Sequence, residues 1–384
     1  MSKAPRLVLG VVLAHWPHAS AGNVCAIMHW ALGFRELGWE VWIAEHLSSS
    51  ELLPPESPDS ASQQEEFWKA TVEEFGFHSC ECLLIDGKAP QLEAFREFAS
   101  GADLFINFAG HFRRFDLLGS HTAKVYLDVD PGFTQLWVEV FDSDMNLEGH
   151  NFFLTVGTTM HLPGALLPRL GREWIPVFPP VVASYWRRKL GAIPDVAAEA
   201  PWTTIAHWYG YPDVEWQGRR YGGKRESLVA MRDLPRSLAR PCVIATDLAP
   251  DWEDYGPFAE SGWRLIPSAD VCRNVPSYLR FIAESRGEIG IAKEGYVVSR
   301  GGWMSDRSVV YLALGRPLVL QDTGWTRAVA PCDGMLAFHD TRDCADAIRS
   351  IEENYETHAR AALALADTIF SPCGVLKPLL EKVL

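Results

Sequence analysis

Short, continuous runs of apolar residues recur along the first half of the chain, separated by stretches with helical patterns. Residues 6–14 form the first run, and the next strand candidates are residues 40–45, 82–85, 104–108 and 124–127. Strands that are buried on both faces read as unbroken apolar runs, which is typical of parallel sheets. Strands that alternate with helices predict a doubly wound α/β domain, whose ligands lie at the carboxyl ends of the strands.

The same alternation starts again after residues 174–182, a segment with three prolines that we interpret as a stiff connector. A chain of 384 residues is too long for one ordinary core, so two domains are expected. We predict domains at residues 1–177 and 178–365, followed by a terminal helix at 366–384. The strand candidates of the second domain are residues 203–209, 242–245, 263–266, 289–292 and 318–320.

The composition restricts the partners and the compartment. The formal net charge is −14 and no basic block occurs, which argues against a nucleic acid or an anionic membrane as the main partner. Eight cysteines without a regular framework are typical of reduced thiols in a cytoplasmic protein. Residues 3–21 imitate a secretory signal, but we interpret them as a first strand and its loop. No stretch approaching 18 apolar residues was found, so membrane insertion is not expected, and the oligomeric state stays open.

The most informative block is residues 297–324, VVSRGGWMSDRSVVYLALGRPLVLQDTG. Gly301 and Gly302 lie in a loop where backbone amides can turn toward a ligand. Ser305 is a good N-cap for a helix that ends before Gly315. The start of that helix is suited to a phosphate, and Arg300 and Arg307 flank it.

Within this region, KEGYVVSRGG (293–302) and YLALGRPLV (311–319) resemble the EGFG…EAMAxGxPVV region of GT-B-fold glycosyltransferases. The resemblance implies two Rossmann-like domains facing a central cleft, with the last helix packing back on the N-terminal domain. It also implies that the N-terminal domain holds the acceptor and the C-terminal domain the nucleotide sugar. The two glutamates of the retaining pattern would fall on Gly302 and Val310, so Asp306 is the candidate substitute.

The resemblance further implies a set of donor-binding positions. An arginine–lysine pair on the diphosphate would correspond to Arg219 and Lys224, beyond a hairpin expected around residues 217–218. The backbone of Val275, in the segment 270–278, would read the nucleobase. The donor-site candidates are Arg219, Lys224, Val275, Arg300, Gly301, Gly302, Ser305, Asp306, Arg307 and Thr323.

The catalytic candidates follow strands of the N-terminal half. His15 follows the first strand and is our first choice for a general base, with His18 as a substitute. His111 follows the strand at 104–108, where retaining members of the fold carry a histidine. Asp130, with Asp128, could orient His15, although capping of a turn or metal ligation are alternatives for this pair.

Four tryptophans could stack on a sugar or aglycone, while packing in a core remains an alternative for each. They are Trp16, Trp216, Trp303 and Trp325.

These observations predict a glycosyltransferase that moves a sugar from a UDP- or TDP-type donor to a small-molecule or peptide acceptor. The diphosphate would be met by cations and helix amides, so no metal or other cofactor is expected. One alternative is a nucleotide-sugar 2-epimerase of the same fold, and another is a non-catalytic sugar-nucleotide-binding or assembly protein. A Rossmann dehydrogenase is disfavoured because the G-x-G-x-x-G fingerprint is missing.

Overall fold

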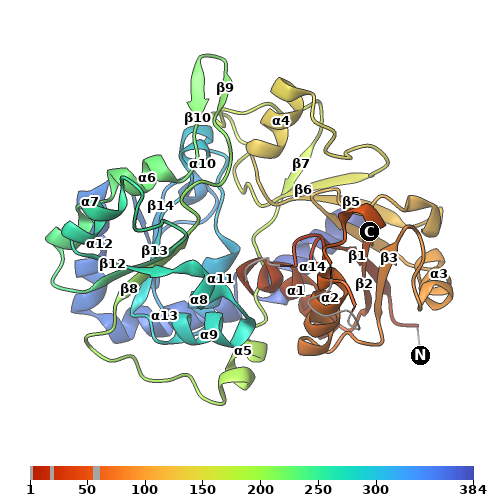
Figure 1. Cartoon of the computed structure of the whole chain (residues 1–384), viewed down its shortest axis with the longest axis horizontal. Helices are drawn as coiled ribbons and strands as arrows, with labels where there is room; N and C mark the ends of the chain where they lie inside the picture. Colours follow the sequence, from red (N-terminus) through yellow and green to blue (C-terminus); the bar gives the residue numbers. More distant parts are fainter. Residues whose placement is uncertain (1–2, 18–20, 55–60) are drawn as a thin grey trace.

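The computed structural model describes residues 3–17, 21–54 and 61–384, and it contains two parallel sheets covered by helices (Figure 1). The first sheet has the order β3-β2-β1-β4-β5-β6-β7. Its strands are β1 (Arg6–Gly10), β2 (Glu40–Leu47), β3 (Glu81–Ile85), β4 (Leu104–Phe108), β5 (Ala123–Asp128), β6 (Phe152–Thr155) and β7 (Trp174–Pro176).

The central strands of this sheet are buried because the apolar runs of the sequence lie between two helical layers. Residues Leu7, Val8 and Leu9 of β1 have no exposed surface. The helices and 3₁₀ turns of this half are α1 (Ala21–Glu36), η1 (Ser49–Glu51), α2 (Gln63–Glu74), α3 (Leu92–Ser100), η2 (Phe115–Leu117) and α4 (Phe133–Phe141). Helix α1 begins at Ala21, two residues before the cap that Asn23 was expected to form.

The second sheet has the order β12-β11-β8-β13-β14-β15, with every pair parallel. Its strands are β8 (Trp202–Ala206), β11 (Cys242–Thr246), β12 (Trp263–Pro267), β13 (Gly287–Gly290), β14 (Leu318–Gln321) and β15 (Met335–Phe338). Because β8 and β13 are neighbours although β11 and β12 of the same sheet come between them in the chain, the topological switch point lies between them.

Helices cover both faces of this second sheet. The helices and 3₁₀ turns of the C-terminal half of the chain are α5 (Ala183–Leu190), α6 (Arg225–Ala230), η3 (Leu234–Ser237), α7 (Tyr255–Glu260), α8 (Ser268–Cys272), α9 (Val275–Ala283), α10 (Glu294–Ser299), α11 (Asp306–Ala313), η4 (Trp325–Arg327), α12 (Thr341–Glu353), α13 (Tyr355–Asp367) and α14 (Pro372–Val383), the last of which packs on the first domain. Two Rossmann-like sheets in one chain confirm the predicted fold class.

The expected connector at residues 174–182 is only partly a connector. Its first three residues form β7, an edge strand that pairs in parallel with β6. Proline is tolerated there because an edge strand does not need every amide in the ladder. The domain boundary predicted between residues 177 and 178 falls just after this strand, in the connection that leads to α5.

The hairpin predicted around Gln217 and Gly218 is confirmed, with β9 (Val214–Trp216) antiparallel to β10 (Arg219–Tyr221). Both turn residues have positive φ, 48° and 71°, as a type I′ turn requires. The single helix expected over residues 345–367 is instead α12 and α13, which meet at Asn354.

The C-terminal helix α14 lies beside α1 of the first domain, so the chain crosses back at its end (Figure 1). A Cβ on Gly33 of α1 would lie 2.9 Å from Leu376, which shows how closely the two helices approach.

By length and composition, the stretch Tyr355–Val383 could cross a membrane, which corrects the expectation that no such stretch exists. This is weak evidence, because the core helix of a soluble protein meets the same test. Here the stretch is two helices, α13 and α14, interrupted at residues 368–371.

Candidate functional site

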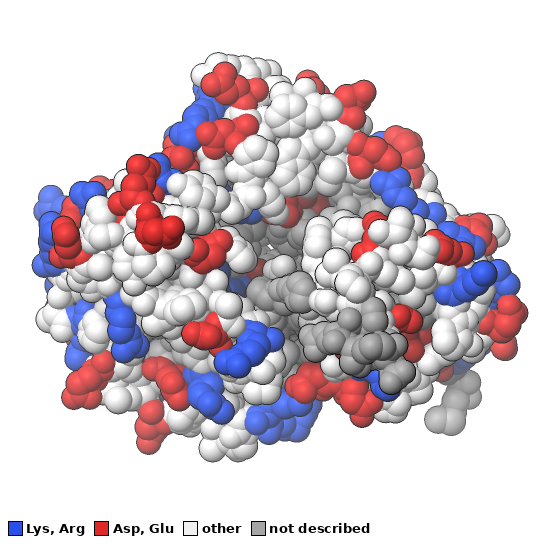
Figure 2. Space-filling view, in the orientation of Figure 1, with Lys and Arg blue, Asp and Glu red and all other residues white. Residues whose placement is uncertain are grey.

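The carboxyl end of the first sheet faces the second domain. Asp130 follows β5 and Thr158 and Thr159 follow β6, and all three side chains bond to groups of the C-terminal domain. His15 and His111 follow β1 and β4 at the same edge. In Figure 2 the molecular surface is hollowed between the two halves. The catalytic candidates therefore lie on the side of the N-terminal domain where ligands of doubly wound sheets bind.

The glycine loop is a junction between the domains. The carbonyl of Gly302 accepts hydrogen bonds from the amide and the hydroxyl of Thr158, and the carbonyl of Gly301 accepts one from the amide of Thr159. A Cβ on Gly302 would lie 2.5 Å from Oγ1 of Thr159. The glycines thus allow another segment of backbone to approach closely.

The amides of this loop, which the sequence suggested for a ligand, are bonded within the protein. The Gly302 amide donates to the carbonyl of Thr323 at 2.9 Å, and the Gly301 amide donates to Oγ of Ser299 at 3.3 Å. The Thr323 hydroxyl donates to the carbonyl of Trp303. In this conformation Gly301, Gly302 and Thr323 shape the loop, and none of these donors points free into a ligand site.

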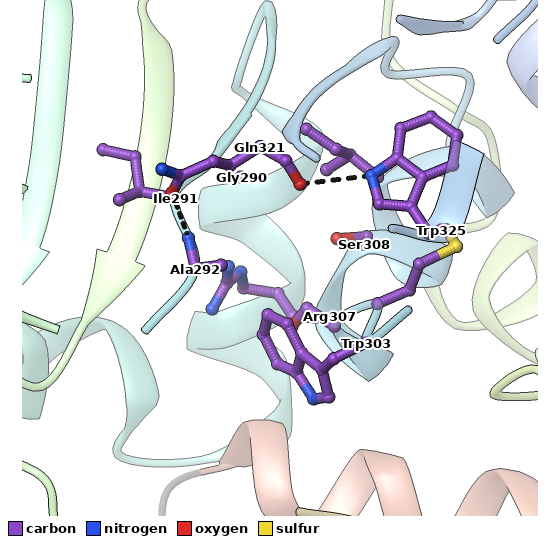
Figure 3. A pocket seen from close by; sticks show the side chains of 11 residues that line it. Gly290, Ile291, Ala292, Trp303, Arg307, Ser308, Gln321 and Trp325 are labelled. Carbon is purple, nitrogen blue, oxygen red and sulfur yellow. Dashed lines mark hydrogen bonds between the residues drawn. The ribbon is translucent and has the colours of Figure 1, made fainter. Parts of the chain in front are cut away.

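A small cavity lies at the start of α11, between that helix and the carboxyl ends of β13 and β14 (Figure 3). Its volume is about 10 Å³, roughly the space of one water molecule. Ser305, Arg307 and Ser308 line it from the helix side, and Gln321 lines it from β14. Nη2 of Arg307 and Oγ of Ser308 are buried without a hydrogen-bond partner among the described residues. The helix start therefore presents unused polar groups to this cavity.

Glu288 of β13, which was not among the predicted site residues, fixes the position of the Arg307 side chain. Nε of Arg307 lies 2.6 Å from Oε1 of Glu288, whose side chain has no exposed surface. Nη1 of Arg307 donates to the carbonyl of Ile205 at 3.0 Å. Glu288 could have been identified from the sequence as a glutamate inside an apolar parallel strand, because a buried carboxylate needs a cationic partner.

Lys224 lies at the start of α6 and is 8% exposed. Burial lowers the pKa of its ammonium well below the usual value, and the charges of Arg307 and Lys293 lower it further. Among the described residues, none accepts a hydrogen bond from its Nζ atom. Lys293 and Arg307 thus both lie near Lys224, and we call these three residues the cation group.

The two predicted donor arginines other than Arg307 are exposed and lie outside the cation group. Arg219 is exposed on β10, while its neighbour Arg220 pairs with Asp213, Glu226 and Glu294. Arg300 is exposed at the end of α10 with a φ of 51°. Arg219 is thus exposed on the hairpin, whereas Lys224, its predicted partner on the diphosphate, is buried at the start of α6.

Val275 begins helix α9 and is buried, so the expected nucleobase loop at residues 270–278 is instead α8 and the first turn of α9. Helix α9 contacts α1 of the first domain. In this arrangement Val275 belongs to the core that joins the two domains.

Asp306, the candidate substitute for a missing glutamate, accepts a hydrogen bond from the amide of Arg307 at 3.1 Å. Burial raises the pKa of this carboxyl above its usual value, against the charge of Arg307. Ser305, whose backbone has N-cap geometry, makes no side-chain cap bond; its hydroxyl lies 3.5 Å from the Asp306 carboxylate. Asp306 thus takes over part of the capping that Ser305 was expected to provide.

The loop after β1 is held by Glu45 at the end of β2. The Glu45 carboxylate accepts hydrogen bonds of 2.7–2.8 Å from the amides of Leu13, Ala14 and His15. Burial raises the pKa of Glu45 to about 7, against these three hydrogen bonds. Nδ1 of His15 lies 3.6 Å from Oε1 of Glu51. His18 lies outside the described residues.

His15, His111 and Trp16 form one aromatic cluster at this edge. The ring centroids of His15 and His111 are 6.1 Å apart, and Trp16 lies edge-on to both rings. Burial lowers the pKa of His111 to about 4, with a further contribution from His15, so His111 is neutral near pH 7. Trp16 is 49% exposed, and its ring is accessible to a ligand.

Asp128 and Asp130 do not orient His15. Asp128 has no exposed surface, and its carboxylate accepts hydrogen bonds from Thr134, Gln135 and Thr155. Burial raises the pKa of Asp128 to about 6. The Asp128 carboxylate also accepts the amide of Asp130 at 3.1 Å, so it caps the turn that aims Asp130 at the C-terminal domain.

Of the other tryptophan candidates, Trp325 is buried, and Trp303 and Trp216 are partly buried. Trp325 has no exposed surface, and Trp303 stacks on Tyr296 with a centroid distance of 4.3 Å. Trp216 packs in the aromatic cluster between α4 and α10. Within the described residues, no group of three or more His, Cys, Asp or Glu side chains is arranged to hold a metal ion.

Comparison with known proteins places this arrangement among the GT-B structures. The chain is similar over its whole length to an α-glucosyltransferase solved with UDP and a 13-mer DNA, with 9% identity, full coverage of both chains and a TM-score of 0.59. AviGT4, a glycosyltransferase of avilamycin A biosynthesis, gives a TM-score of 0.54 at 13% identity, covering 99% of this chain and 97% of that one.

The Anabaena protein HepE, solved with UDP and glucose, gives a TM-score of 0.52 at 11% identity, covering 98% of this chain and 99% of that one. No protein-family model and no curated protein sequence matches the chain. At these identities the likeness shows the GT-B fold, which confirms the architecture inferred from the sequence.

Proposed function

We propose that this protein is a glycosyltransferase that moves a sugar from a nucleoside-diphosphate donor to a small-molecule or peptide acceptor. The observation that carries the proposal is the cation group, whose members lie at the starts of α6, α10 and α11. Nη2 of Arg307 is buried without an acceptor among the described residues, and Lys224 is only 8% exposed. Buried cations without acceptors are costly for a folded protein, and a diphosphate would satisfy them.

In the proposed donor complex, the diphosphate lies against the start of α11. Lys224 and Nη2 of Arg307 would donate to its oxygens, and the hydroxyls of Ser305 and Ser308 would add further hydrogen bonds. Glu288 fixes the plane of the Arg307 guanidinium. This arrangement replaces the expected pair of Arg219 and Lys224, and it needs no metal ion to balance the phosphate charge.

In the proposed reaction, an acceptor hydroxyl lies at the carboxyl edge of the first sheet. The His15 imidazole takes the hydroxyl proton while the oxygen forms a bond to the anomeric carbon. The bond from that carbon to the phosphate oxygen breaks, and its electron pair leaves with the nucleoside diphosphate. Lys224 and Arg307 stabilise the charge on the leaving group, and Glu51 lies on the Nδ1 side of His15.

The exposed ring of Trp16 supports an acceptor with a sugar or aromatic face, because such faces stack on tryptophan. Although one structural neighbour was solved with DNA, we do not propose DNA as the acceptor of this protein. A net charge of −14 opposes binding to a polyanion, and within the proposal the acceptor is small. A cytoplasmic location belongs to the same proposal.

The test is calorimetric titration with UDP, TDP, GDP, ADP and NAD, each with and without magnesium, followed by an assay of sugar transfer and donor hydrolysis. We expect one nucleoside diphosphate to bind, and Lys224→Met to weaken it by about tenfold or more. Arg342→Met, at an exposed cation of α12, is the matched control and should bind like the wild type. Binding without transfer or hydrolysis would favour a non-catalytic binding protein, and binding of NAD alone would overturn the proposal.

A further inference from the structure

Asp130 of the N-terminal domain is bonded by three side chains of the C-terminal domain. Its Oδ2 accepts a hydrogen bond from the Tyr211 hydroxyl at 3.0 Å, and its Oδ1 accepts one from the Tyr296 hydroxyl at 2.5 Å. Nζ of Lys293 lies 3.3 Å from Oδ1. The buried Asp128 accepts the Asp130 amide, and the two tyrosine hydroxyls hold the Asp130 carboxylate toward the other domain.

Lys293 lies at the start of α10 in an aromatic surrounding. Its Nζ atom is 3.5 Å from the ring centroid of Tyr211, and it also faces the rings of Tyr296 and Phe133 at 5.0 and 5.5 Å. Burial lowers the pKa of this ammonium, and Asp130 opposes that shift. Asp130 is thus the group that compensates the charge of Lys293 in this partly dehydrated position.

Lys293 is also a member of the cation group. The amide of Glu294, next to Lys293, donates to the carbonyl of Gly223, next to Lys224, at 2.9 Å, so the starts of α10 and α6 lie side by side. The charge of Lys293 also lowers the pKa of Lys224. Nη2 of Arg307 is buried without an acceptor among the described residues, whereas the acceptor of Lys293 is a carboxylate from the opposite domain. A diphosphate bound to the other two cations would therefore compete with Asp130 for this ammonium.

We propose that Lys293 is a phosphate-binding residue of the donor site, and that Asp130 occupies its ammonium across the domain junction until a diphosphate displaces it. This inference rests on the proposed function and adds a residue to it. Lys293 supplies the second lysine charge for the diphosphate, in the role that Arg219 cannot fill from the exposed hairpin. After displacement, Asp130 keeps the two tyrosine hydroxyls as donors.

The arrangement couples donor binding to the contact between the domains. The ion pair between Asp130 and Lys293 is one of the polar links across the cleft, and donor binding exchanges it for a contact within the C-terminal domain. Donor binding therefore includes the cost of breaking one cross-domain ion pair. The observed affinity of the protein for the donor is lower than it would be if Asp130 and Lys293 were already separated.

The experiment measures binding of inorganic pyrophosphate, and of the nucleoside diphosphate that binds best, to four full-length proteins. These are the wild type, Lys293→Met, Asp130→Asn and the double variant. We expect Lys293→Met to weaken both ligands by about tenfold, and Asp130→Asn to tighten both severalfold because the competitor loses its charge. In the double variant the gain from Asp130→Asn should disappear. Lys69→Met, at an exposed lysine of α2, is the matched control.

The outcomes separate this inference from the proposed function. If the wild type binds neither ligand, the proposed donor site is wrong and this inference falls with it. If the wild type binds and Lys224→Met does not, but Lys293→Met binds like the wild type, only the role of Lys293 is overturned. Weaker binding in Asp130→Asn would also overturn it. Should Lys293→Met fail to fold, the comparison of Asp130→Asn with the wild type still decides.

Discussion

Arg307 at the start of α11 pairs with Glu288 of β13 at 2.6 Å, and neither side chain exposes more than 14% of its surface. Oε2 of Glu288 and Nη2 of Arg307 have no further partner among the described residues. The pair therefore fixes a guanidinium beside the cavity while leaving one of its donor groups unused. This geometry is suited to binding an anion. It also means that replacing either residue alone leaves the other buried without its charged partner.

Removing one member of this pair should destabilise the protein more than removing both. Glu288→Leu leaves a buried arginine without its carboxylate, and the expected cost is about 3–5 kcal/mol in the free energy of unfolding. In Glu288→Leu/Arg307→Met both charges are gone, so much of the loss should be recovered. Urea unfolding of the wild type, both single variants and the double variant measures this coupling. Additive single effects would contradict it.

Lys224→Met should stabilise the fold although it weakens nucleotide binding. The pKa of Lys224 is lowered in the folded protein by burial and by the nearby cations. The unfolded chain therefore holds this proton more tightly, and a charged Lys224 costs folding free energy. We expect the methionine variant to gain about 0.5–2 kcal/mol in urea unfolding at pH 7. A loss of stability together with a loss of binding would instead indicate a structural role.

The pH dependence of stability should include a contribution from Glu45. Its pKa in the folded protein is raised to about 7, whereas an unfolded glutamate titrates near pH ~4.3. The folded protein thus holds more protons between these values, so this contribution is complete below about pH 4 and is lost as the pH rises through about 7. Unfolding free energies from pH 4 to 8 should therefore fall less steeply in Glu45→Gln than in the wild type.

Asp128, whose pKa is raised to about 6, also lowers the free energy of unfolding as the pH rises. This contribution is present in the wild type and in Glu45→Gln, so the free energy of unfolding of the variant should still fall with pH. Glu40→Gln, at an exposed position of the same strand as Glu45, is the control for that experiment and should keep the wild-type slope. An unchanged slope in Glu45→Gln would show that the buried carboxylate is ionised throughout.

Gly302→Ala should destabilise the contact between the domains. The added Cβ would meet Thr158 and Thr159 at 2.5–2.6 Å, and the residue has a φ of 80°. Gly171→Ala is the matched control, because its φ is 64° and nothing lies within 4 Å of the added atom. We expect Gly302→Ala to lower the free energy of unfolding by about 1–3 kcal/mol more than the control. Equal losses would mean that the threonines move aside without cost.

The secondary elements with the clearest local patterns were predictable. The apolar runs of β1 and β4, the hairpin at Gln217 and Gly218, and the helix that ends before Gly315 all formed as expected. Strands β7 and β15 were missed because short edge strands have little apolar periodicity. Helix α10 (Glu294–Ser299), which leads into the glycine loop, was not predicted.

The candidate site was predictable only in part. Lys224, Arg307 and His15 were selected because helix starts and strand ends have sequence signals. Glu288 and Lys293 were not, since their roles depend on partners distant in the chain, 19 residues away for Glu288 and 163 for Lys293.

The sequence by itself determined two doubly wound sheets, because burial of continuous apolar strands is a local and periodic property. Only the tertiary structure decided what the polar loops do. Gly302 admits Thr158 and Thr159 where a free amide was expected, and Asp130 reaches Lys293 where a contact with His15 was expected. The physical reason is that contacts between two domains depend on which loops meet when the sheets pack, and no periodicity within either loop specifies that meeting.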